Sequence, residues 1–297
     1  NFFYPNPLQS MGQHQRQAWF GCACCPSNAA RFIPSLPQYI YAVKDNALYI
    51  NLFNSNTVNV KVGKTPVTLT QQTNYPWNGD ITLTIDNGAG HYALNIRIPG
   101  WVKGEVVPSN LYTYADGKRL GYTIKVNGKD VTNGNSNSQL STLNSQLNNG
   151  YFVIDRQWKK GDKVEIHFDM EPRVVRANGQ VAADKGRVAI ERGPIVYCAE
   201  HPDNSCDVLS VLINQEPTFQ LGNKTIMNTN VQTLTTDAQT LTFNSQGKLQ
   251  AQDERLVLIP YYAWAHRGPG KMTVWIPQDL NATTPAQPAS KALATIS

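Results

Sequence analysis

The sequence is poor in charged residues and has no long apolar run. Asp, Glu, Lys and Arg together make up 16% of its 297 residues. The apolar runs are no longer than a β-strand, which excludes a membrane-spanning helix, and Asn1 opens the chain without the basic and apolar regions of a signal peptide. The 26 basic and 21 acidic residues are scattered rather than arranged in a stripe, so nucleic acid is not an expected partner.

Helical periodicity is also scarce after residue 40. Short runs instead alternate between apolar and polar residues, as at residues 47–53 and 163–168, and Gly, Asn, Asp and Pro bound them. Asn127-Gly128 and Asn149-Gly150 are typical of tight hairpins. Many short strands without intervening helices predict an all-β chain of two antiparallel β-sandwich domains. Expected strands of the second sandwich are residues 187–190, 195–199, 208–213, 239–243, 256–259 and 272–275.

Composition divides the chain into four segments. The first combines a Pro-rich loop with a short helix that begins near Pro26, and is typical of the last piece of a helical unit whose remainder is absent. The first sandwich contains a polar Asn/Ser/Gln-rich loop at residues 133–149. We therefore expect a loop-plus-helix remnant, two sandwiches and a tail, at residues 1–40, 41–174, 175–277 and 278–297 in that order.

The five cysteines are too clustered for a disulfide framework. Cys22, Cys24 and Cys25 lie within four residues, just before the expected helix start, where the helix dipole favours thiolates. Thiolates bind zinc and attack electrophiles, but no second CxxC or HxxxH pair is present to complete a zinc site. The competing interpretation is that the three thiols are buried and inert. A disulfide is disfavoured, because a bond between neighbouring cysteines is strained.

Other candidate residues have structural as well as functional explanations. Cys198 and Cys206 either form a disulfide across a short loop or remain free thiols. We expect Glu191 to form a structural ion pair beside a Gly-Pro turn rather than to act in catalysis. His201 and His266 have no partner at ligand spacing. Five tryptophans are expected to pack in the sandwich cores, and the alternative is that they form a sugar-stacking platform. They are Trp77, Trp101, Trp158, Trp264 and Trp275.

The motifs of the first forty residues resemble the segment that closes the catalytic barrel of glycoside hydrolase family 127, the β-L-arabinofuranosidase group, which is similar to family 146. The double-cysteine-proline motif is the most specific part of the resemblance. Matching positions near the start of the chain are Tyr4-Pro-Asn-Pro-Leu8, Arg16, Trp19-Phe-Gly-Cys-Ala-Cys-Cys-Pro-Ser-Asn28 and Arg31. Further matches lie at residues 150–162, 186–200 and 258–275, so the resemblance covers nearly all of the chain except the polar loop and the tail.

The resemblance implies a zinc-dependent retaining glycosidase acting on β-L-arabinofuranosides or related sugars of plant glycans. Cys24 would be the nucleophile and a zinc ligand, Cys25 a second zinc ligand, and Tyr4 a contact to the oligosaccharide substrate. Cys22 matches a family cysteine that is not a ligand.

The family's acid/base glutamate and its other two zinc ligands lie in an (α/α)6 catalytic barrel upstream. The resemblance therefore implies that residues 1–40 are the end of that barrel, and that the chain by itself is inactive and holds zinc weakly or not at all. The alternative is a non-catalytic carbohydrate-binding or scaffolding module with a structural cysteine cluster. Composition suggests a periplasmic or extracellular location.

Overall fold

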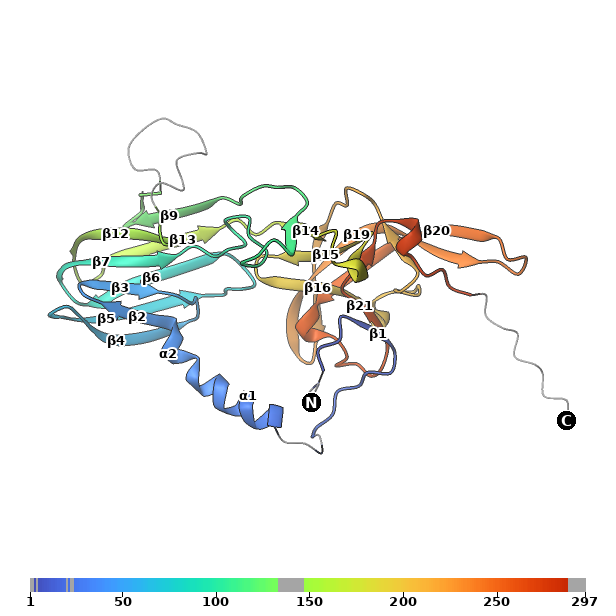
Figure 1. Cartoon of the computed structure of the whole chain (residues 1–297). Coiled ribbons are helices and arrows are strands. Elements are labelled where there is room, and N and C mark those ends of the chain that lie inside the picture. The colour runs from blue at the N-terminus through green and yellow to red at the C-terminus, as the bar shows by residue number, and fades with distance from the viewer. Residues whose placement is uncertain (1–2, 4, 20, 22–23, 133–146, 288–297) are drawn as a thin grey trace. The chain divides into compact units, whose positions relative to one another are not determined.

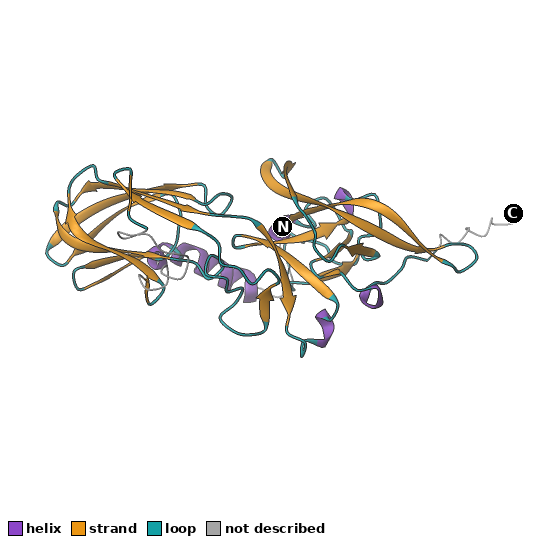
Figure 2. Cartoon of the chain, turned by 90° about the horizontal axis from the view of Figure 1, so that it is seen from above, coloured by secondary structure: helices purple, strands orange, loops and turns teal. Residues whose placement is uncertain are grey.

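Strands dominate the part of the chain that the computed structural model describes, namely residues 3, 5–19, 21, 24–132 and 147–287 (Figure 1). The α-helices of these residues are α1 (Cys24–Ser35) and α2 (Pro37–Ile40), and none of them is long and apolar enough to cross a membrane. The prediction of a mostly β chain is confirmed (Figure 2). Short 3₁₀ turns are η2 (Ala182–Asp184), η3 (His201–Asp203), η4 (Tyr261–Ala263) and η5 (Leu280–Ala282).

The chain folds into two compact units. The middle unit comprises Cys22–Pro108 and Gly117–Glu171. The terminal unit comprises Asn1–Gly21, Ser109–Asp116 and Pro172–Ser297. The first residues of the chain therefore fold with its C-terminal part, and one short segment interrupts the middle unit.

The middle unit contains two sheets. The order of the five-stranded sheet is β11-β12-β7-β3-β2 and that of the six-stranded sheet is β10-β9-β13-β6-β5-β4. The strands of the first are β2 (Tyr41–Lys44), β3 (Ala47–Ile50), β7 (Gly90–Arg97), β11 (Leu147–Asn148) and β12 (Tyr151–Trp158). Those of the second are β4 (Asn56–Val62), β5 (Thr65–Thr73), β6 (Asp80–Asn87), β9 (Tyr122–Val126), β10 (Lys129–Asp130) and β13 (Lys163–Phe168).

Aromatic side chains join the two sheets in a shared core. Phe53, which follows β3, contacts Phe168 of β13 with ring centroids 5.4 Å apart, and the ring of Tyr122 in β9 lies 6.4 Å from that of Phe152 in β12. β9 and β13 alternate strictly between buried and exposed residues, because one face of each strand covers the core. The middle unit is thus a sandwich of two sheets.

One pairing of the middle unit differs from the all-antiparallel prediction. β3 and β7 run parallel, with Tyr49 beside Asn95. After β3 the chain forms β4, β5 and β6 in the other sheet and then returns as β7. A strand that returns through such a crossover can run parallel to the strand before it, whereas a tight hairpin gives an antiparallel neighbour.

The predicted hairpin turns are confirmed. Asn127 and Gly128 both have positive φ angles, of 51° and 80°, and join β9 to β10. Asn149 and Gly150 do the same, at 51° and 84°, between β11 and β12. A type I′ turn needs positive φ at both central residues, and Asn-Gly adopts it at little cost. The polar loop expected before β11 lies outside the described residues up to residue 146.

The terminal unit is built on one branched sheet of 11 strands, not on the two separate sheets predicted. The branch arises because β16 pairs with β15 and β20, and also with β21. Its strands are β1 (Gln9–Met11), β8 (Tyr112–Tyr114), β14 (Pro172–Ala177), β15 (Arg187–Arg192), β16 (Ile195–Glu200), β17 (Val211–Ile213), β18 (Gln220–Ile226), β19 (Thr229–Phe243), β20 (Leu249–Pro260), β21 (Lys271–Thr273) and β22 (Ile276–Pro277).

A long three-stranded segment of the terminal unit was not expected from the sequence. β18 pairs with the first half of β19, and β19 pairs with β20 from Leu234 to Phe243. The β18–β19 turn is Met227-Asn228, with φ angles of 50° and 60°. β18 lacks the apolar–polar alternation that predicts a strand, because Gln, Asn, Lys and Thr fill most of its positions and only Ile226 is buried.

Residues 278–287 pack on the terminal unit instead of forming part of a loose tail. Gln278 is buried and its amide donates hydrogen bonds to the carbonyls of Asn214 and Gln215, at 2.6 and 3.1 Å. The hydroxyl of Ser210 donates to the carbonyl of Thr284 at 2.8 Å. Composition could not show this packing, because polar groups and not apolar side chains make the contacts.

Candidate functional site

The two adjacent thiols lie in the first turn of a helix in the middle unit. α1 begins at Cys24, two residues before Pro26, so that Cys24 and Cys25 belong to the helix itself. Both are exposed, and their sulfur atoms are 3.6 Å apart. Pro26 is the third helical residue, where its missing N–H costs no intrahelical hydrogen bond. Exposure of both thiols argues against the interpretation that they are buried and inert.

The geometry of the pair fits half of a zinc site. Two sulfurs that are each about 2.3 Å from one tetrahedral zinc ion are about 3.8 Å apart. The observed 3.6 Å between Cys24 Sγ and Cys25 Sγ is close to that separation. Among the described residues no group of three or more His, Cys, Asp or Glu side chains could hold a metal ion. Among the described residues, Cys24 and Cys25 could therefore supply two sulfur ligands and no third.

The helix that carries the thiols is amphipathic but leaves its apolar side chains uncovered. None of the 12 residues of α1 is buried, and Phe32 and Ile33 are 57% and 62% exposed. Leu36 and Tyr39, which follow α1, are also exposed. In a globular protein the apolar stripe of such a helix normally faces other elements.

The first residues of the chain are clamped to the terminal unit. The ring of Phe3 stacks on Trp264 with centroids 4.6 Å apart. The guanidinium of Arg16 lies 4.6 Å from the Phe3 ring centroid and donates to the carbonyls of Trp264 and Tyr262, at 2.9 and 3.1 Å. Tyr4, the expected sugar contact, lies outside the described residues, as does Cys22. The clamp fixes the residue directly before Tyr4.

A cluster of buried charges holds the loop that follows Trp264. Arg267 forms ion pairs with Glu200 and Asp203, whose side chains are almost completely buried, and Lys224 Nζ lies 2.5 Å from Asp203 Oδ1. Glu200 also accepts a hydrogen bond from the backbone N–H of Ala265 at 2.6 Å. Burial alone would raise the pKa of Asp203, but the hydrogen bonds from Arg267 and Lys224 outweigh it and lower that pKa. Arg267 is 64 residues from Asp203 and 67 from Glu200, and these separations hid the cluster from the sequence analysis.

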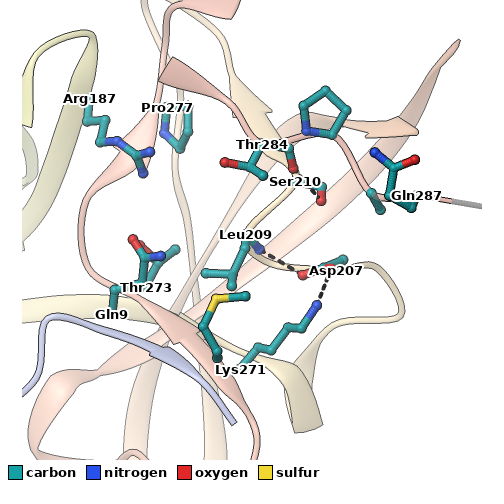
Figure 3. A pocket seen from close by; sticks show the side chains of 13 residues that line it. Gln9, Arg187, Asp207, Leu209, Ser210, Lys271, Thr273, Pro277, Thr284 and Gln287 are labelled. Atoms are coloured by element: carbon teal, nitrogen blue, oxygen red, sulfur yellow. Dashed lines mark hydrogen bonds and ion pairs between the residues drawn. The ribbon is translucent and has the colours of Figure 1, made fainter. Parts of the chain in front are cut away.

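A hollow in the terminal unit has a structural explanation (Figure 3). It has a volume of about 210 Å³ and lies between β1, β21 and residues 284–287. Its polar side chains are engaged by their neighbours: Asp207 pairs with Lys271, and Arg187 donates to the carbonyl of Ala282 at 2.7 Å. The hollow therefore marks the place where residues 278–287 pack on the sheet.

The remaining candidates have structural roles. Glu191 accepts a hydrogen bond from the hydroxyl of Tyr114 at 2.9 Å. It does not pair with Arg192, because neighbouring residues of a strand point to opposite faces of the sheet. Burial raises the pKa of Glu191. Core packing is confirmed for three tryptophans, whereas Trp77 is 45% exposed and Trp275 is partly buried against Tyr112. The buried three are Trp101, Trp158 and Trp264.

Three family models together match nearly the whole chain. Residues 1–38 match the catalytic domain of the GH127 β-L-arabinofuranosidases. Residues 47–170 match the GH127 middle domain, and residues 172–277 match the C-terminal domain of glycoside hydrolase family 127. The chain belongs to glycoside hydrolase family 127. The first of these matches contains the thiol pair and the clamp residues Phe3 and Arg16, so the GH127 catalytic segment spans parts of both units.

The relatives of this GH127 chain are longer than the chain. The non-reducing end β-L-arabinofuranosidase of Bifidobacterium longum subsp. longum is 31% identical over 91% of the chain and 40% of the relative. A solved GH127 β-arabinofuranosidase is 54% identical, with a TM-score of 0.88 over 97% of this chain and 43% of that one. A GH127 β-L-arabinofuranosidase from Geobacillus stearothermophilus T6 is 30% identical, with a TM-score of 0.78 over 93% and 42%. The chain thus spans about two fifths of their length.

The remaining two cysteines of this GH127 chain are buried free thiols. Cys198 in β16 and Cys206 in the loop before β17 do not form the disulfide that the sequence left open. Burial raises the pKa of Cys198 well above its ordinary value, and the carboxylates of Glu200 and Asp203 add to the shift. Burial also raises the pKa of Cys206. Both groups therefore stay protonated and poorly nucleophilic at neutral pH.

Thiol labelling is expected to separate the two kinds of cysteine. In the native chain, treated first with a chelator, iodoacetamide should modify Cys24 and Cys25 at least about 100-fold faster than Cys198, because the first two thiols are exposed to the reagent whereas burial shields Cys198 and raises its pKa. Peptide mass spectrometry after timed quenching measures the rates. In denaturant the difference should disappear. Equal rates in the native chain would contradict the burial of Cys198.

Proposed function

We propose that this chain is the C-terminal portion of a zinc-dependent, retaining glycoside hydrolase that cleaves β-L-arabinofuranosides or related sugars of plant glycans. The observation that carries the proposal is the pair of exposed thiols in the first turn of α1, inside the match to the GH127 catalytic domain. The relatives support the substrate class, because each of the three named above is called a β-arabinofuranosidase.

Cys24 would act as the nucleophile. Its sulfur forms a bond to the anomeric carbon, the glycosidic C–O bond breaks, and a general acid donates a proton to the leaving oxygen. Water then attacks the same carbon, gives up a proton to the same group acting as base, and releases Cys24 as a thiolate. Two displacements at one carbon give net retention of configuration.

Zinc is the proposed cofactor, with Cys24 and Cys25 as two of its ligands. When bound, the ion would keep both sulfurs deprotonated and fix their direction. The two sulfur atoms have a separation that suits one tetrahedral ion. The acid/base glutamate and the other zinc ligands would come from a helical catalytic barrel upstream in the longer polypeptide.

The uncovered face of α1 supports that arrangement. Phe32, Ile33, Leu36 and Tyr39 are all more than a third exposed. Burying a side chain of this size contributes about 1.5–3 kcal/mol. We propose that the helices of the barrel cover this face and complete the active site around Cys24. The plant-glycan substrate and the composition support a periplasmic or extracellular location.

The proposal predicts a difference between the chain and the longer enzyme. The 297-residue chain alone should release no arabinose from a β-L-arabinofuranosyl disaccharide, since it lacks a proton donor for the leaving oxygen. The longer polypeptide that includes the barrel should hydrolyse it, and NMR should show the β-anomer as the first product. The α-linked disaccharide is the matched control and should remain intact. An inactive longer enzyme, or an inverted first product, would overturn the proposed function.

The clamp on Phe3 predicts a positioning role for Arg16. In the longer enzyme, Arg16→Ala should raise KM about tenfold and change kcat much less, because it loosens the residues next to the proposed sugar contact Tyr4. Steady-state kinetics on the β-L-arabinofuranoside measure the split. Arg255→Ala, which removes an exposed arginine elsewhere in the terminal unit, should leave both constants unchanged. An equal fall in kcat and rise in KM with a lower Tm would indicate general destabilisation instead.

The alternative function, a non-catalytic module with a structural cysteine cluster, has less support. A structural cluster would bury its sulfurs in the fold, whereas Cys24 and Cys25 are both exposed. The match to a catalytic-domain model at these same residues also favours the enzyme.

A further inference from the structure

A polar hollow lies on the outer face of the five-stranded sheet of the middle unit. Its volume is about 340 Å³, within the range of small-molecule sites. Tyr49 of β3, Asn95 of β7 and Val153 of β12 stand beside one another in the register of the sheet and line the hollow. Their sequence neighbours Leu48 and Leu94 are fully buried and point to the opposite face, into the core.

Side-chain size explains why this face is hollowed. Ala42 of β2 stands beside Tyr49, and Ala47 and Ala93 occupy the next row of the same face. Tyr151 packs against Tyr49 edge to face, with ring centroids 5.2 Å apart. Small residues thus leave space beside two aromatic rings that stand up from the sheet.

Asn95 lines this hollow and carries a buried acceptor atom without a partner among the described residues. The residue is only 6% exposed, and its Oδ1 accepts no hydrogen bond from the described residues. A buried acceptor left in that state costs about 1–3 kcal/mol relative to a satisfied one. Asn51, in contrast, is engaged, because its Oδ1 accepts a hydrogen bond from the hydroxyl of Tyr151 at 2.8 Å. The arrangement leaves one prepared acceptor beside two rings.

The chemistry of the lining selects a neutral polyhydroxylated ligand. Amides offer both donors and acceptors, as sugar hydroxyl groups do, and tyrosine rings present apolar faces to sugar C–H groups. Lys44 is the charged residue of the lining. A phosphate or carboxylate ligand would require several converging cations. The amides come from four asparagines: Asn51, Asn95, Asn148 and Asn149.

We propose that this hollow is a non-catalytic binding site for a neutral oligosaccharide, held by the tyrosine pair and by hydrogen bonds between its hydroxyl groups and the asparagine amides, that of Asn95 among them. The proposal rests on the hollow alone and does not depend on the chemistry of Cys24. It gives the middle unit a function of its own, which is to hold a glycan chain.

Calorimetric titration of the 297-residue chain tests the site. The probes are linear L-arabino-oligosaccharide, xylohexaose and, as the charged counterpart, an oligogalacturonate. At least one neutral probe should bind with a dissociation constant of about 1 mM or tighter. Asn95→Ala should weaken that binding at least tenfold while Tm stays the same or rises, since the variant loses an unsatisfied atom. Asn59→Ala, on the exposed face of β4 in the other sheet, should bind like the wild type.

Three calorimetric results would overturn the proposal. They are the absence of binding to both neutral probes, unchanged binding in Asn95→Ala, and binding of the charged probe alone. If Asn95→Ala lowers Tm, NMR of the wild-type chain provides a separate test of the site. The side-chain amide resonances of Asn51 and Asn95 must shift when the oligosaccharide is titrated in. Binding that leaves these resonances unmoved also overturns it. Hydrolysis by the longer enzyme is measured separately, so failure of the proposed function would leave this result standing.

Discussion

Cys24→Ser in the longer enzyme is expected to lower kcat/KM for a β-L-arabinofuranoside by at least about 10⁴-fold. Serine has nearly the same size, but a hydroxyl group is a much weaker acid and a much poorer nucleophile than a thiol. The loss is large because the nucleophile takes part in both displacements. The loss should fall on kcat, since the sulfur does its work after the sugar has bound.

Two further measurements identify the reason for that loss. Mass spectrometry of wild-type enzyme quenched during turnover should find the peptide of Cys24 heavier by one pentosyl group. Ser27→Ala is the matched control, because the Ser27 hydroxyl donates a hydrogen bond to the backbone carbonyl of Cys24, at 3.1 Å, and the variant should keep nearly full activity. Cys25→Ser should reduce both zinc content and activity. Wild-type turnover by Cys24→Ser would refute the assigned nucleophile.

Arg267→Met is expected to lower the free energy of unfolding of the terminal unit by about 3–5 kcal/mol. The substitution leaves Glu200, which is 1% exposed, without its arginine partner, and Asp203 with Lys224 alone. Uncompensated buried carboxylates are far more costly than exposed ones. Tm should fall by roughly 6–20 °C, as measured by calorimetry. The exposed pair of Arg255 and Asp237 gives the matched control: Arg255→Met should cost less than about 1 kcal/mol.

The same cluster sets the sign of a pH dependence. Because the pKa of Asp203 is lowered in the folded state, its carboxylate contributes stability above the unfolded pKa of about 4, and this stability is lost as pH falls through the folded pKa. Wild-type stability should therefore fall steeply below about pH 4. The Arg267→Met variant should show a shallower fall, since its Asp203 has lost the main stabilising partner. Parallel curves would exclude this role of Asp203.

Local sequence signals predicted much of the fold. Alternation located strands such as β9 and β13, and the Asn-Gly pairs located the hairpin turns, because both depend on neighbouring residues alone. The Cys-Cys-Pro motif located the thiol pair at a helix start. β18 was missed because its residues are mostly polar, and the parallel pairing of β3 with β7 was missed because it depends on a crossover through another sheet.

Interactions between distant residues could not be predicted in this way. Glu200 and Arg267 are 67 residues apart, and nothing in either local sequence shows that their side chains meet. Asn95 also has an ordinary position in an alternating strand. Its burial and its unpaired oxygen depend on Tyr49 and Val153, which the sheet brings beside it from other parts of the chain.

The short strand β8 affects how this protein can be divided. The chain leaves the middle unit at Ser109, adds Tyr112–Tyr114 to the sheet of the terminal unit beside β14, and returns after Asp116. Asp116 also forms an ion pair with the buried Arg173, at 2.6 Å. To exchange the middle unit between relatives, the chain must therefore be joined at both ends of that unit and also on both sides of β8. Gene fusion at the single point between Glu171 and Pro172 would separate Arg173 from its carboxylate and so disrupt the terminal unit.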